Sequence, residues 1–175
     1  MEKKINIGLI GETAVIMELL KRGYDVVNLN IFRNNYKRAD IICMDSEGGK
    51  NTMIQVKTGT TKNFIIGLVS ETDGTIERLE EKIVGPWVFV YTDNKCSSME
   101  FYILSREETI ELIKTSCDWY ANQWNRQLKH RQPAGIELNW LRGKPSKATK
   151  NHPEYKSSLK ETSKDRWDKI EDLLK

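Results

Sequence analysis

The chain has 175 residues, of which 38% are hydrophobic and 30% are charged. This length and balance fit one globular domain with a sizeable core and exclude a wholly disordered chain. No window approaches the roughly 20 apolar residues of a membrane span, and no apolar signal core follows the charged N-terminus. The three cysteines have no paired or metal-binding spacing, so the sequence indicates a cytoplasmic protein with no membrane partner.

The net charge of +3 is unevenly distributed along the chain. Residues 1–124 contain 15 Lys and Arg against 18 Asp and Glu, whereas residues 125–175 contain 13 against 7. A basic C-terminal third fits a polyanion partner such as nucleic acid, although a solvated Lys-rich tail has the same composition. We expect one domain over residues 1–142 and a basic extension over residues 143–175, part of which reads as a poorly ordered arm.

The first half of the chain predicts a helix followed by strands. Apolar residues at helical spacing favour a helix over residues 6–22, which Gly23 would end. Strands are expected at residues 24–30, 39–45 and 52–58, and the turn Ser46-Glu-Gly-Gly-Lys50 would join the last two as a hairpin. Residues 63–70 predict a further short strand.

The second half predicts helices that alternate with strands. A helix over residues 75–84 would stop before Pro86, and strands follow at residues 87–91 and 101–104. Ser105 and Glu108 match a capping box, which opens a helix with an apolar stripe from Ile110 to Leu128. A strand at residues 136–141 and a short helix at residues 166–174 complete an α/β domain with a mixed β-sheet flanked by helices.

Glu12 is out of place on its predicted helix. At about 100° per residue it falls within the arc formed by Leu9, Val15, Ile16, Leu19 and Leu20. A carboxylate on a core-facing stripe is costly unless a cation or strong donors meet it. Glu12 is therefore a candidate ligand; the structural alternatives are a buried ion pair, or a helix whose apolar face stops one turn late near the N-terminus.

Two neighbouring strands carry further polar residues. Asp40 opens an apolar strand, where an acid is unusual except at a strand end. On the next strand, side chains alternate, so Gln55 and Lys57 point to one side and Ile54 and Val56 to the other. A helix acid, a strand acid and a polar-x-Lys strand together are a far less common pattern than any of them alone.

This combination suits phosphodiester hydrolysis. Mg²⁺ prefers oxygen ligands, which Glu12, Asp40, the Gln55 side chain and the Val56 carbonyl could supply, and Mn²⁺ can substitute. Lys57 would orient the nucleophile and offset the charge of the transition state. Oxygens more than about 8 Å apart could not share one such cation.

The runs GETAVIMELLKRGYDVV, RADIICMD and MIQVKTG resemble the PD-(D/E)XK nuclease superfamily, which includes restriction endonucleases. The resemblance covers roughly residues 5–60. It implies a restriction endonuclease-like fold with an α-β-β-β-α-β core, and catalytic roles for Glu12, Asp40, Gln55 and Lys57. Gln55 replaces the usual acid, a variant that removes one negative charge, and Ala39 replaces the usual Pro.

The leading hypothesis is a Mg²⁺-dependent endonuclease that acts on DNA. The first alternative is a catalytically inactive nuclease-fold module that binds nucleic acid. The second is an α/β domain in which Glu12 pairs with Lys57 and a protein partner sets the function. A homodimer would supply the two active sites that double-strand cleavage requires.

Overall fold

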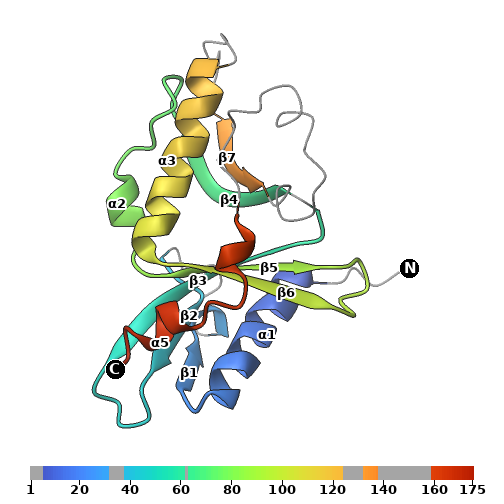
Figure 1. Ribbon diagram of the computed structural model, residues 1–175, viewed down its shortest axis with the longest axis vertical. Helices are drawn as coiled ribbons and strands as arrows, with labels where there is room; N and C mark the ends of the chain where they lie inside the picture. The colour runs from blue at the N-terminus through green and yellow to red at the C-terminus, as the bar shows by residue number, and fades with distance from the viewer. Residues whose placement is uncertain (1–5, 32–37, 62, 124–131, 138–158) are drawn as a thin grey trace.

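The computed structural model describes residues 6–31, 38–61, 63–123, 132–137 and 159–175 (Figure 1). Its centre is a five-stranded sheet in the order β1-β2-β3-β5-β6. The five strands are β1 (Asp25–Asn28), β2 (Ile41–Met44), β3 (Asn51–Gly59), β5 (Trp87–Thr92) and β6 (Met99–Leu104). β3 and β5 run parallel and the other neighbours run antiparallel, so the fold is the mixed α/β sheet that the sequence predicts.

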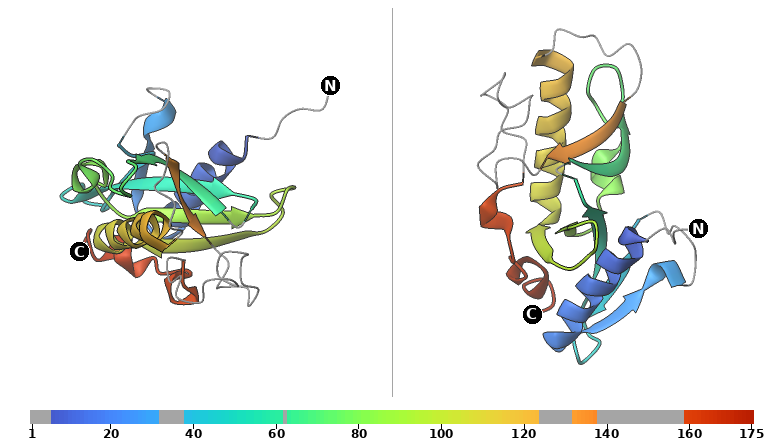
Figure 2. Two further views of the ribbon diagram at one scale, coloured as in Figure 1. Left: turned by 90° about the horizontal axis from the view of Figure 1, so that it is seen from above. Right: turned by 90° about the vertical axis from the view of Figure 1, so that its right-hand side faces the viewer.

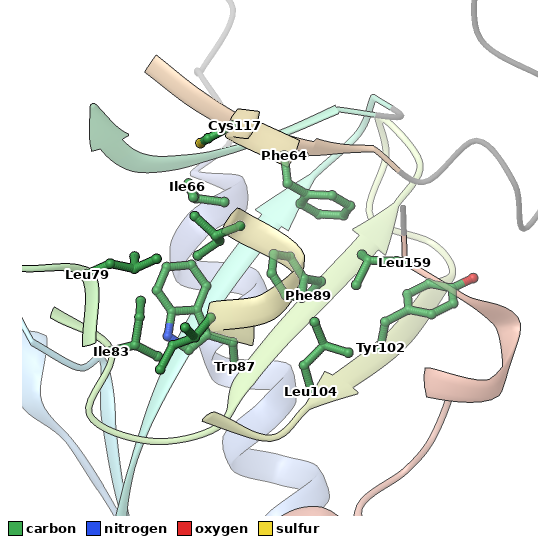
Figure 3. Close-up of a cluster of buried hydrophobic side chains, with 12 residues drawn as sticks. Phe64, Ile66, Leu79, Ile83, Trp87, Phe89, Tyr102, Leu104, Cys117 and Leu159 are labelled. Carbon is green, nitrogen blue, oxygen red and sulfur yellow. The ribbon is translucent and has the colours of Figure 1, made fainter. Parts of the chain in front are cut away.

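The central strands are apolar on both faces because helices cover both sides of the sheet. Val88 and Val90 of β5 pack with one cluster, which includes Val15 and Leu19 of α1 (Ile7–Lys21). Trp87 and Phe89 of the same strand point to the other cluster, under α3 (Arg106–Gln123) (Figure 3). Because successive side chains of a strand point to opposite faces, β5 contributes to both hydrophobic clusters.

Helix α1 begins and ends close to the expected limits. The Asn6 side chain accepts a hydrogen bond from the Leu9 N–H at its start, and Gly23, directly after the C-cap residue Arg22, has a φ of 86°. The expected apolar arc is partly wrong, because Leu9 and Leu20 are 50% and 53% exposed.

The face of α1 that meets the sheet contains Gly11, Val15 and Leu19. A Cβ at position 11 would lie 1.9 Å from the Thr58 Oγ1 of β3, so glycine allows the helix to approach this closely. Because of this close approach, the helix face that packs on the sheet differs from the arc of large apolar residues that the sequence predicts. Glu12 still lies on the sheet side, one turn before Val15 and Ile16.

A second layer covers the α3 face of the sheet. Strand β4 (Asn63–Ser70) pairs with β7 (Gln132–Glu137) in a separate antiparallel ribbon beside α3 (Figures 1 and 2). The predicted limits of β4 are confirmed. β7 begins four residues earlier than expected and includes Pro133, which pairs opposite Val69 in a ribbon of only two strands.

Two other expected limits are corrected. β1 ends at Asn28, and a 3₁₀ turn (Leu29–Ile31) follows it. The helix expected over residues 75–84 is reduced to α2 (Leu79–Lys82) because Asp73 accepts hydrogen bonds from the Thr75 N–H and hydroxyl in a turn. The capping box is confirmed by the reciprocal Ser105 and Glu108 contacts of 2.8 and 3.2 Å. The far end of the α3 stripe lies outside the described residues.

The last seventeen residues pack against the sheet. They contain a 3₁₀ turn (Glu161–Ser163) and α5 (Asp168–Glu171), and Leu159, Trp167, Ile170 and Leu174 are buried. Residues 138–158, which include the first part of the expected basic extension, lie outside the described residues. Among the helices that are described, none is both long and apolar enough to cross a bilayer.

Candidate active site

Asp40 directly precedes β2, at the point where the pairing of β2 with β3 ends. β2 pairs with β3 from Ile41 onward, and the Asp40 N–H still donates to the Ile54 carbonyl at 2.9 Å. Beyond this point the edge of β3 is open to the Asp40 side chain. Its Oδ2 accepts hydrogen bonds from the Val56 N–H at 2.8 Å and from the Gln55 side-chain amide. Asp40 is only 8% exposed, so these donors fix a buried carboxylate.

Two asparagines connect Asp40 to Glu12. The Asn30 Nδ2 donates to the Glu12 Oε1 at 3.2 Å and to the Asp40 Oδ1 at 3.1 Å. The two carboxylate oxygens are therefore at most about 6.3 Å apart, the sum of those contacts. Asn28 donates to the other oxygen of Glu12 at 3.4 Å, and its own Oδ1 accepts from the Asn30 N–H. One amide nitrogen thus sits between the two acids.

The Glu12 carboxyl is electrostatically disfavoured in its ionised form. Burial raises its pKa above the ordinary value, and the nearby Asp40 charge also raises it. The hydrogen bonds from Asn30 and Asn28 and the charge of Lys57 oppose this rise in pKa without reversing it. A cation placed between Glu12 and Asp40 would relieve both the desolvation and the repulsion.

Lys57 brings a partly desolvated ammonium to the same place. Burial lowers its pKa, and the charges of Asp40 and Glu12 act in the opposite direction. The Nζ lies 5.4 Å from the centre of the Trp87 ring, which favours the charged form through a cation–π contact. Gln55 pairs with Trp87 and Lys57 with Phe89 in the β3–β5 register, so the rigid sheet fixes both polar residues.

A cleft of about 600 Å³ opens beside these residues. Asp40, Gln55 and Lys57 line one side, and β4 and α2 line the other. The charged residues around it are four basic and two acidic side chains: Arg38, Lys57, Arg78, Lys82, Asp40 and Glu81. The cleft therefore has a formal charge of +2, although residues 1–124 as a whole are acidic.

The donor set fits a hard divalent cation. Glu12 and Asp40 would provide two carboxylates, and the Gln55 amide would provide its oxygen after a half-turn. The N–H and C=O of a strand residue point to the same side, so the Val56 carbonyl leaves β3 on the Asp40 side. Among the described residues, no three His, Cys, Asp or Glu side chains are grouped so that they could hold a metal ion, and at this site Gln55 stands where a third acid would be.

The structure brings together all the residues that the sequence singled out. Glu12, Asp40, Gln55 and Lys57 come from α1, the start of β2, and β3. Sequence reasoning missed Asn28 and Asn30, two polar residues at the end of the predicted apolar strand 24–30, although a polar residue at a strand end is what identified Asp40. It also missed Trp87 and the basic residues of α2, whose position depends on the three-dimensional fold.

Comparison with known proteins gives little further information. No protein-family model matches the chain, and no curated protein matches it. Among solved structures, the chain is similar to a bacterial homing endonuclease, I-Ssp6803I, with a TM-score of 0.42 and 20% sequence identity. The similar region covers 60% of this chain and 70% of that one. A likeness at this level concerns the arrangement of helices and strands and carries no information about activity.

Proposed function

We propose that the protein is a metal-dependent endonuclease that hydrolyses DNA phosphodiester bonds. The observation that carries this proposal is the shared contact of Glu12 and Asp40 with the Asn30 amide, with Lys57 close to both acids. The order of these residues along the chain, which resembles the PD-(D/E)XK pattern, supports the same reading.

The cation would be Mg²⁺, with Mn²⁺ as a substitute, held by Glu12, Asp40, the Gln55 amide oxygen and the Val56 carbonyl. When bound, it would supply Lewis-acid polarisation of the scissile phosphate. For these contacts to form, Asn30 must release the two carboxylates and Gln55 must turn its amide oxygen toward Asp40. Both changes rotate side-chain amides, so neither breaks a backbone hydrogen bond of the sheet.

Lys57 would bind the phosphate from the β3 side. Its ammonium can donate to a non-bridging phosphate oxygen and stabilise the negative charge that grows as water attacks the phosphorus. In the overall reaction one water is consumed, one P–O ester bond breaks, and the leaving oxygen takes a proton. The low exposure of Asp40 and the Trp87 ring keep bulk water away from the ammonium, which strengthens its attraction to the phosphate.

Gln55 favours one alternative function. A neutral amide in place of a third acid lowers the negative charge available to a cation, and a site with two carboxylates could bind DNA without cutting it. The cleft would then be a nucleic-acid-binding surface on a nuclease-like fold.

A cleavage assay separates these functions. Purified protein is incubated with supercoiled, linear, single-stranded and branched DNA, with Mg²⁺, Mn²⁺ or EDTA. We expect cutting only with a divalent cation, and at least a 100-fold loss of rate in Asp40→Asn and Lys57→Ala. Asp25→Asn and Lys50→Ala are matched controls, because Asp25 and Lys50 are exposed and line no part of the cleft.

Two results would count against catalysis. Folded wild-type protein that retains DNA in a salt-dependent manner but yields no product would support the binding module. Product formation by Asp40→Asn or Lys57→Ala at the wild-type rate would mean that the cutting site lies elsewhere. A homodimer remains a prediction, which the ratio of nicked to linear plasmid and the mass in solution would test.

A further inference from the structure

The basic wall of the cleft opposite Lys57 comes from α2. Arg78, the residue that precedes α2, and Glu81 and Lys82 within α2 all line the cleft. Leu79 and Ile83 are buried and hold the other face against the core beside Trp87 (Figure 3). α2 therefore presents two cations and one acid to the same cleft that contains the candidate active site.

The position of α2 is fixed by α3. The Arg106 guanidinium donates to the carbonyls of Glu80 and Ile83 at 2.6 and 2.7 Å, and Lys114 pairs with the Glu80 carboxylate at 2.5 Å. These contacts engage the carbonyl and the carboxylate of Glu80. The side chains of Arg78 and Lys82 take no part in them and line the cleft. A short helix held at several points is a rigid platform for its cations.

Within this cationic face, one ion pair is internal. The Arg78 Nε lies 3.1 Å from the Glu81 Oε2, and the two side chains are 67% and 64% exposed. An exposed pair of this kind is weak and exchanges readily with other charges. A phosphate that enters the cleft would compete with Glu81 for the Arg78 guanidinium, which suits the paired oxygens of a phosphate.

We propose that Arg78 and Lys82, together with Arg38, bind backbone phosphates on either side of the one that is cut, and that Glu81 occupies Arg78 until DNA displaces it. This inference rests on the proposed function, because it places the DNA strand between α2 and the Lys57 side of the cleft. It assigns α2 to substrate binding rather than to the chemical step.

The test measures DNA binding without cleavage. Anisotropy of a labelled DNA duplex is followed in EDTA across about 50 to 200 mM salt, the range in which phosphate contacts weaken strongly. Arg78→Gln and Lys82→Gln should each weaken binding several-fold and reduce the slope of log affinity against log salt by about 0.9. Lys95→Gln, in the turn at the far end of β5, is the matched control and should change neither quantity.

Glu81 gives a change in the opposite direction. Glu81→Gln should tighten binding about threefold, since one phosphate contact no longer has a competitor. Glu47→Gln, an exposed acid in the β2–β3 turn, should have no effect. In the Arg78→Gln background the gain from Glu81→Gln should disappear, because the two side chains act as one pair.

Each outcome decides the proposal separately from catalysis. Unchanged affinity and slope in Arg78→Gln and Lys82→Gln would overturn the phosphate site, even if the protein cuts DNA. If Glu81→Gln tightened DNA binding equally with and without Arg78, Glu81 would act only by repelling the phosphates. That result would overturn the proposed competition between Glu81 and DNA for Arg78. If the variants behave as expected but no DNA is ever cut, the phosphate site stands and the proposed catalysis falls.

Discussion

Replacing Gly11 by alanine tests how closely α1 must approach the sheet. Alanine is the better helix former by about 1 kcal/mol, so propensity alone predicts a more stable protein. The structure predicts the opposite, because the new Cβ would lie 1.9 Å from the Thr58 Oγ1 and 2.8 Å from the Thr58 Cβ. Contacts below about 3.0 Å do not persist, so the helix must move outward by roughly 1 Å.

The size of the effect follows from two opposing terms. Overpacking of a buried contact costs about 1–3 kcal/mol, and helix propensity returns about 1 kcal/mol. We expect a net loss of up to about 2 kcal/mol, which lowers the Tm of a chain of this size by up to about 8 °C. Because Glu12 is the next residue, the same shift moves its carboxylate away from Asp40. A displacement of about 1 Å in an active site can reduce the rate about 100-fold.

Gly8→Ala in the same helix is the matched control. Its Cβ would meet only the Asn6 Oδ1 at 3.7 Å, an ordinary contact, so the Tm should stay level or rise by up to about 4 °C. Thermal unfolding followed by circular dichroism gives the two Tm values, and plasmid cleavage gives the rates. A Gly11→Ala protein as stable as Gly8→Ala would refute the close approach of α1 to Thr58.

Three further predictions concern the acid pair, the helix cap and the C-terminal segment. Burial raises the pKa of Glu12, so its neutral form stabilises the folded state and that stabilisation is lost as pH rises through the raised pKa. Glu12→Gln should therefore raise the free energy of unfolding at neutral pH in EDTA by less than about 1 kcal/mol, since solvent still screens this half-buried group, and should abolish Mn²⁺ binding in titration calorimetry. Ser105→Ala should cost about 1 kcal/mol in urea unfolding without changing DNA affinity, because it removes only the α3 cap. Trp167→Ala should cost about 3–5 kcal/mol, since this ring is 4% exposed, packs on Phe101 and lies 4.5 Å from the Arg22 guanidinium; a loss below 1 kcal/mol would contradict its place in the core.

Local patterns predicted the strands of the site because strand geometry leaves few choices. Ile54 and Val56 are buried and Gln55 and Lys57 lie on the cleft side, as alternation requires. The hairpin of β2 and β3 then sets the register that brings Asp40 next to Val56. Both results depend on contacts within twenty residues, which a sequence pattern can capture.

The orientation of α1 depends on a contact that no hydrophobicity pattern contains. Gly11 faces the sheet because it is small, whereas Leu9 and Leu20 are left 50% and 53% exposed. A helical wheel gives weight to large apolar residues and none to a glycine that allows close packing. The wheel still placed Glu12 on the sheet side because Val15 and Leu19 dominate the true buried face.

The charges of the site explain why Asn30 and Gln55 belong to it. Glu12 and Asp40 lie near each other in a partly desolvated corner, where two ionised carboxylates repel. Amide nitrogens from Asn30 and Gln55 donate hydrogen bonds to these acids and offset part of that repulsion. Each amide also carries an oxygen, the kind of ligand that the proposed cation would need. A third carboxylate in place of Gln55 would increase this repulsion, so the neutral amide favours the stable pairing of Glu12 with Asp40.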